Sequence, residues 1–65
     1  MISYEPLHRT LHEKGITMSS MRDTVINSRT QARIGRNESV TLTTIADICR
    51  HLDVPIEKVV RIERI

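Results

Sequence analysis

The middle of this 65-residue chain is rich in side chains that can bind anions. Residues 14–37 hold five basic residues against one acidic residue, a formal charge of +4, whereas the rest of the chain carries −2. The basic residues are Lys14, Arg22, Arg29, Arg33 and Arg36, and the acidic one is Asp23. An arginine guanidinium can bind a phosphate, or the O6 and N7 atoms of guanine, through paired hydrogen bonds. The distribution therefore favours a polyanion held on one face.

Other reactive residue types do not form a site. His8 and His12 have the spacing of two metal ligands on one helix face, but the third candidate, Cys49, falls on a packing face. The sequence shows no nucleophile with its base, no glycine-rich phosphate loop and no paired carboxylates. We therefore expect no metal, no cofactor, no small-molecule substrate and no enzymatic activity.

Length and composition exclude several classes of protein. The chain is long enough for one small domain, which we place at residues 1–65. No apolar run approaches the roughly 18–20 residues of a membrane span, and the single cysteine is typical of a reducing cytoplasm, so we expect a cytoplasmic protein. Tyr4 is the only aromatic residue, which argues against modules that stack RNA or single-stranded bases on exposed rings.

The apolar period and the capping residues predict two helices in the first part of the chain. Ser3 predicts the N-cap of a helix over residues 4–14. Thr17 predicts the start of a short second helix that carries Met21 and Val25 on its inner face.

A third helix is expected over residues 28–34, after a turn at Asn27. Its inward stripe is thin and consists of Ile26, Thr30 and Ile34. A helix this polar is not held by its own amphipathicity, so its exposed side chains are kept for contact with another molecule.

The remaining elements follow from a clear period and a proline. Thr41 predicts the cap of a fourth helix, and the apolar positions of that helix are Leu42, Ile45, Ile48, Cys49 and Leu52. Pro55 predicts the start of a fifth helix that ends near residue 60. The first and last residues alternate in hydropathy, which predicts extended termini that could pair within one chain or between two.

Two short helices with a tight turn between them, the second one polar and arginine-bearing, form a helix-turn-helix pattern. Over about residues 7–60 the sequence resembles the short single-domain members of the Cro/C1-type (XRE-like, lambda-repressor-like) transcriptional regulators. The motifs are Leu11-x-x-x-Gly15-Ile16-Thr17-x-x-x-Met21, Asn27-Ser28-Arg29-Thr30-x-x-Arg33-Ile34 and Thr41-Leu42-x-x-Ile45-x-x-Ile48-Cys49-x-x-Leu52-Asp53-Val54. The resemblance implies an all-α, five-helix fold with the helix-turn-helix at about residues 17–34. It also implies sequence-specific binding of double-stranded DNA and hence a nucleoid-associated protein.

The resemblance also implies which residues contact DNA. In this family the first turns of the third helix read bases in the major groove, and the base-contact candidates are therefore Ser28, Arg29 and Arg33. The phosphate-contact candidates lie at helix starts and in the following loop, and they are Thr17, Ser19, Asn27 and Arg36.

We also expect a homodimer, because one recognition helix makes few base contacts. The candidate dimer surfaces are the apolar tail, with Ile62 and Ile65, and the outer face of the fifth helix.

Two features depart from the family and leave an alternative open. The turn Val25-Ile26-Asn27 lacks the usual glycine and is one residue short, and Gln31 stands where the family has an apolar residue. These departures favour a protein-interaction module, such as an anti-repressor, antitoxin or scaffold, with little DNA binding of its own. Salt dependence separates the two functions, because log affinity for DNA falls by about 0.9 per phosphate contact with each unit of log salt.

Overall fold

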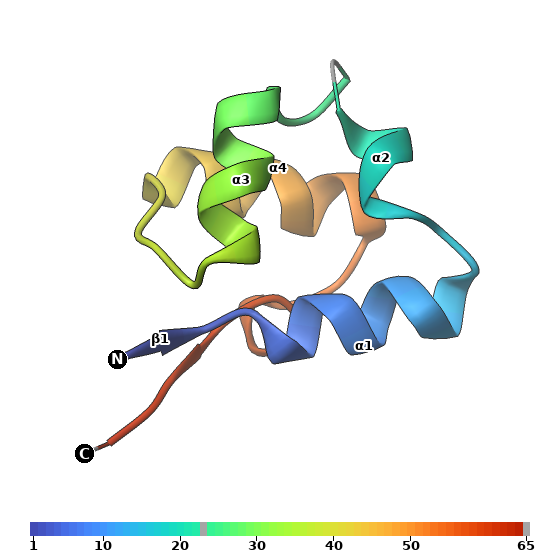
Figure 1. Ribbon diagram of the computed structural model, residues 1–65. Coiled ribbons are helices and arrows are strands. Elements are labelled where there is room, and N and C mark those ends of the chain that lie inside the picture. The colour runs from blue at the N-terminus through green and yellow to red at the C-terminus, as the bar shows by residue number, and fades with distance from the viewer. Residues whose placement is uncertain (23, 65) are drawn as a thin grey trace.

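The computed structural model describes residues 1–22 and 24–64, which form four α-helices, one turn of 3-10 helix and two short strands (Figure 1). In chain order the elements are β1 (Ile2–Ser3), α1 (Glu5–Lys14), α2 (Met18–Met21), α3 (Ser28–Gly35), α4 (Leu42–Leu52), η1 (Ile56–Lys58) and β2 (Arg61–Ile62). None of the helices in this described part has the length and hydropathy needed to cross a membrane.

Side-chain caps determine where most helices begin. Three helices start after a residue whose side-chain oxygen accepts a hydrogen bond from the backbone N–H three residues later. These residues are Thr17 (3.2 Å), Asn27 (2.8 Å) and Thr41 (3.1 Å). The predicted caps at Thr17 and Thr41 are confirmed. The N-cap position of α1 is Tyr4 rather than Ser3, although the Ser3 hydroxyl accepts a hydrogen bond from the N–H of Glu5.

The second helix is shorter than predicted. α2 ends at Met21, and Val25 lies beyond it in the turn before α3. The carbonyl of Met21 accepts hydrogen bonds from the backbone N–H groups of both Val25 (2.9 Å) and Ile26 (3.2 Å). This tight turn brings Ile26 into the core, where it is buried.

The prediction of a fifth α-helix is wrong, because η1 is a single 3-10 turn. The side chain of Val59 is completely buried, and its carbonyl accepts a hydrogen bond from the N–H of Leu7 at 3.1 Å. The hydroxyl of Thr10 donates to the carbonyl of Lys58 at 2.7 Å. The carbonyls of Lys58 and Val59 are thus bonded to α1, at the point where a longer helix would use them for its own hydrogen bonds.

The extended termini pair within one chain. β1 and β2 are antiparallel, with Ile2 opposite Ile62 and Ser3 opposite Arg61. The N–H of Glu63 donates to the carbonyl of Met1 at 2.7 Å, which extends the pairing by one residue. β1 and β2, the first and last elements of the chain, therefore lie side by side (Figure 1).

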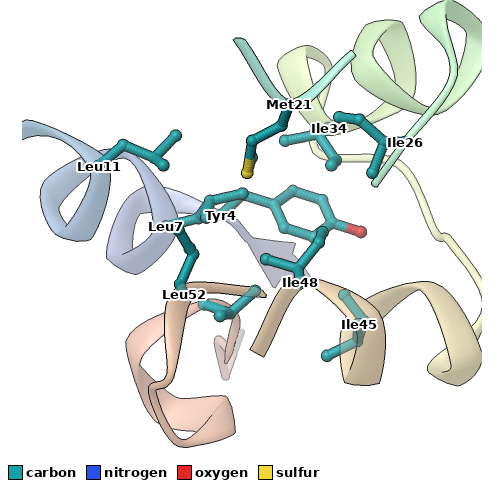
Figure 2. Close-up of a cluster of buried hydrophobic side chains, with 10 residues drawn as sticks. Tyr4, Leu7, Leu11, Met21, Ile26, Ile34, Ile45, Ile48 and Leu52 are labelled. Atoms are coloured by element: carbon teal, nitrogen blue, oxygen red, sulfur yellow. The ribbon is translucent and has the colours of Figure 1, made fainter. Parts of the chain in front are cut away.

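The core takes side chains from all four α-helices and from both terminal segments. Its buried apolar residues are Tyr4, Leu7, Leu11, Met21, Ile26, Ile34, Ile45, Ile48, Leu52 and Val59. The Tyr4 ring lies in the middle of the cluster, with Met21 and Ile34 on one side and Ile48 and Leu52 on the other (Figure 2). α3 contributes only one buried apolar side chain, Ile34, and most of its surface stays outside the core.

Candidate nucleic-acid interface

The exposed side chains of α3 occupy one arc of the helix, about 140° wide at 3.6 residues per turn. They are Ser28, Arg29, Ala32 and Arg33. The opposite side of the helix carries the half-buried Thr30 and Gln31 and the buried Ile34. All three predicted base-contact residues thus lie together on the face turned away from the core.

Arg29 and Arg33 are one turn apart on this arc and both are exposed. Among residues 1–22 and 24–64, no carboxylate lies within ion-pair distance of either guanidinium. Two arginines at this spacing present their donors from one helix face. The arrangement can bind the edge of a guanine or a pair of phosphates.

Three predicted phosphate-contact residues lie at the starts of α2 and α3, and all three are exposed. Thr17 and Asn27 use a side-chain oxygen as a cap, which leaves the Thr17 hydroxyl hydrogen and the Asn27 NH2 group as donors. The hydroxyl of Ser19 makes no hydrogen bond within the described part of the chain. Capping and anion binding are therefore compatible at these positions.

Arg36, the fourth predicted phosphate-contact residue, is held by a neighbour. Its Nε and one terminal nitrogen donate to the two carboxylate oxygens of Glu38, at 2.9 and 3.2 Å. The hydrogen bond from Arg36 lowers the pKa of Glu38, and the carboxylate in turn raises the pKa of Arg36. Both side chains remain exposed, so a phosphate can still reach the three guanidinium N–H groups that do not bond to Glu38, but it does so beside the negative charge of that carboxylate.

A shallow depression of about 470 Å³ lies between α3 and the start of α4. It is lined by Thr30, Arg33, Ser39, Val40, Thr41 and Thr44. Hydroxyl groups beside an arginine suit a sugar-phosphate backbone. Ser39, Thr41 and Thr44 were not among the predicted contact residues, although the capping signal at Thr41 indicates a helix start just after the loop.

The loop that follows α3 is tied to the N-terminal segment. The N–H of Tyr4 donates to Oδ1 of Asn37 at 3.1 Å, and the Tyr4 hydroxyl donates to the carbonyl of Glu38 at 2.6 Å. Burial raises the pKa of the Tyr4 phenol. These two hydrogen bonds could not be predicted from the sequence, since no local signal connects residues more than 30 positions apart.

The remaining reactive side chains lie apart from α3. His8 and His12 are exposed on α1, and the described residues contain no group of three or more potential metal ligands. Cys49 is half-buried against the core, and this burial raises the pKa of its thiol. A raised pKa keeps a thiol protonated and unreactive at neutral pH.

Comparison with known proteins gives two similarities, one to a family model and one to a solved structure. A family model described as the Cro/C1-type HTH DNA-binding domain matches residues 6–63. The crystal structure of the transcriptional regulator VanUg (form II) is similar in fold, with a TM-score of 0.87 and 28% sequence identity over 92% of this chain and 81% of that one. No curated protein matches the sequence.

Proposed function

Because this chain belongs to the Cro/C1-type helix-turn-helix DNA-binding domains, we propose that it regulates transcription by binding specific double-stranded DNA sites with α3 in the major groove. In this proposal residues 1–65 act as one domain. The family is one of DNA-binding domains and not of enzymes. The similarity to a transcriptional regulator supports a role in gene control.

The observation that carries the proposal is the exposed arc of α3. Arg29 and Arg33 lie on it without a carboxylate partner among the described residues, and Ser28 lies at its start. In the proposed complex these three side chains contact base edges. The phosphates are held by Thr17, Ser19, Asn27 and Arg36, which lie at helix starts or just after α3.

Selection of bound sites from a pool of random DNA duplexes tests the proposal. We expect a defined sequence to be enriched, and its affinity to exceed that of random duplex by about 10³-fold or more. Affinity for both should fall steeply as salt rises. Recovery of random sequence only, or an affinity that does not respond to salt, would contradict the proposal.

One observation favours the alternative of a protein-interaction module. Leu42, at the start of α4, is a large apolar side chain that is 78% exposed. An exposed leucine contributes to a protein contact through burial of apolar surface, and such a contact is nearly insensitive to salt. The salt titration described above therefore also tests this alternative.

We further propose that the protein binds DNA as a homodimer that is joined through β2. Glu63 directs its backbone groups towards Met1, so alternation along the strand directs those of Ile62 towards the open edge. The side chain of Ile62 is 72% exposed. Ile65, the other tail residue expected in a dimer, lies outside the described residues.

The tail is self-complementary in charge. If two copies of β2 pair antiparallel about Ile62, Arg61 of each copy lies opposite Glu63 of the other. The two isoleucines then meet at the centre of the contact. The half-exposed Ile56 on η1 supplies further apolar surface on the element that replaces the fifth helix.

A further inference from the structure

α3 is weakly attached to the rest of the molecule through its side chains. It is eight residues long, and Ile34 is its only buried apolar side chain. Thr30 and Gln31 are half-buried and neither is a large apolar residue. A helix with so small a buried surface needs another contact to fix its orientation.

That contact lies at the C-terminal end of α3. The backbone turns there through Asn37, which has a positive φ of 56°. The N–H groups of Asn37 and Glu38 donate to the carbonyls of Ile34 and Arg33, at 3.1 and 2.8 Å. These bonds tie the segment 36–38 to the last turn of the helix, so that it forms an extension of α3.

Tyr4 holds this extension from inside the core. Its ring is 1% exposed and is packed among apolar side chains of α1, α3 and α4 (Figure 2). Its N–H and its hydroxyl donate to Asn37 and Glu38 respectively. Two hydrogen bonds from one buried residue fix both the position and the rotation of the segment they grip.

We propose that Tyr4 is a positioning residue that sets the orientation of α3 for sequence-specific binding, although it does not itself reach the DNA. This inference rests on the proposed function. A change in the angle of α3 misaligns Arg29 and Arg33 with base edges, which require bidentate geometry. The same change has little effect on phosphate contacts, which tolerate small displacements because they depend on charge.

The test compares Tyr4→Phe with a matched control, Thr10→Val. Both variants remove a buried hydroxyl that donates to a backbone carbonyl, at 2.6 Å for Tyr4 and 2.7 Å for Thr10. Of these two hydroxyls, only that of Tyr4 bonds to the loop after α3, whereas that of Thr10 bonds to η1. The measured quantity is the ratio of affinities for the selected site and for random duplex.

We expect Tyr4→Phe to lower this ratio about tenfold, as for one misaligned base contact, with affinity for random duplex unchanged. Thr10→Val should leave the ratio at the wild-type value. Asn37→Gly, which keeps the positive φ and removes the Oδ1 acceptor, should lower the ratio in the same direction. Wild-type ratios for both Tyr4→Phe and Asn37→Gly would overturn the inference.

Amide hydrogen exchange of the free protein separates this inference from the proposed function. In Tyr4→Phe, exchange should become faster at residues 33–38 and remain unchanged in α4. In Thr10→Val, residues 33–38 should keep the wild-type rates. Wild-type exchange at residues 33–38 in Tyr4→Phe would refute the positioning role, whether or not the protein prefers a DNA sequence.

Discussion

The pair formed by Arg36 and Glu38 affects one of the proposed phosphate contacts. The guanidinium donates two hydrogen bonds to the carboxylate, and both groups are exposed. A phosphate that approaches Arg36 meets the negative charge of Glu38 at the same place. Glu38 therefore acts against DNA binding in this geometry.

We predict that Glu38→Gln strengthens binding to random duplex several-fold at low salt. The substitution frees Arg36 for one more phosphate contact, so the slope of log affinity against log salt should steepen by up to about 0.9. Fluorescence anisotropy with a labelled duplex at several salt concentrations measures both quantities. An unchanged slope would show that Glu38 does not interfere with a phosphate contact of Arg36.

The same pair makes a prediction for stability against pH. The pKa of Glu38 is lowered in the folded protein, so its contribution to stability is complete above the ordinary value of 4.5. That contribution is lost as pH falls through the lower, folded-state pKa. Thermal unfolding should therefore show Glu38→Gln to be less stable than wild type at neutral pH, with the difference vanishing in acid. If the difference in stability between Glu38→Gln and wild type persists in acid, it does not arise from the ion pair with Arg36.

The two arginines on the exposed arc of α3 should behave differently from Arg36. We predict that Arg29→Ala and Arg33→Ala each cost about 1–3 kcal/mol of binding free energy at the selected site and relax sequence preference. Arg36→Ala should weaken binding equally on all sequences, because a phosphate contact carries no sequence information. If Arg29→Ala left both affinities unchanged, the proposed orientation of α3 would be wrong.

The N-cap of the helix α3 combines two roles in one side chain. Oδ1 of Asn27 accepts the hydrogen bond that begins the helix, and its NH2 group remains available to a phosphate. We predict that Asn27→Ala lowers the free energy of unfolding by about 1 kcal/mol, as expected for a lost cap. Asn27→Asp keeps the cap acceptor, so it should retain stability and yet bind all DNA more weakly. Chemical denaturation and duplex binding measure the two effects, and equal DNA affinity in Asn27→Asp and wild type would remove Asn27 from the interface.

Local signals in the sequence were sufficient to predict most elements. Thr17 and Thr41 cap the helices they were expected to cap, and the apolar period placed α4 correctly. The prediction of a fifth helix failed because contacts with α1 determine where this segment stops being helical. Val59 and Lys58 make these contacts, and each lies more than 45 residues along the chain from its partner. A pattern along one segment does not contain that information.

The candidate site was predictable to a similar extent. Helical spacing placed Arg29 and Arg33 on one exposed face, which the fold reproduces. The partner of Arg36 and the bonds from Tyr4 to the loop were not foreseen. Both depend on the backbone path after α3, and in particular on the positive φ at Asn37.

The proposed dimer can be tested by charge reversal in the tail that contains β2. In a homodimer of Arg61→Glu, the introduced glutamate of each copy lies opposite Glu63 of the other copy, and in a homodimer of Glu63→Arg the introduced arginine lies opposite Arg61. We predict that each variant alone weakens dimerisation by about 1–2 kcal/mol, because two like-charge pairs form per dimer.

Mixing the two variants provides the control for this prediction. In the mixed dimer every acidic residue of the pairing faces a basic one, so association should recover to the wild-type level. The recovery cannot arise from the bonds that Arg61 makes with Glu5 and Glu63 within its own chain, since mixing does not restore them. Sedimentation equilibrium measures the three samples, and a mixture that stays as weakly associated as its components would exclude pairing through β2.

The position of Tyr4 also makes the protein its own spectroscopic probe. Because the chain has no tryptophan, no phenylalanine and no other tyrosine, all of its near-ultraviolet absorption and dichroism from aromatic rings comes from this one side chain. The ring is enclosed by α1, α3 and α4, and its hydroxyl is bonded beside the end of α3. An optical melting curve of the unlabelled protein therefore reports the detachment of α3 at a single known location.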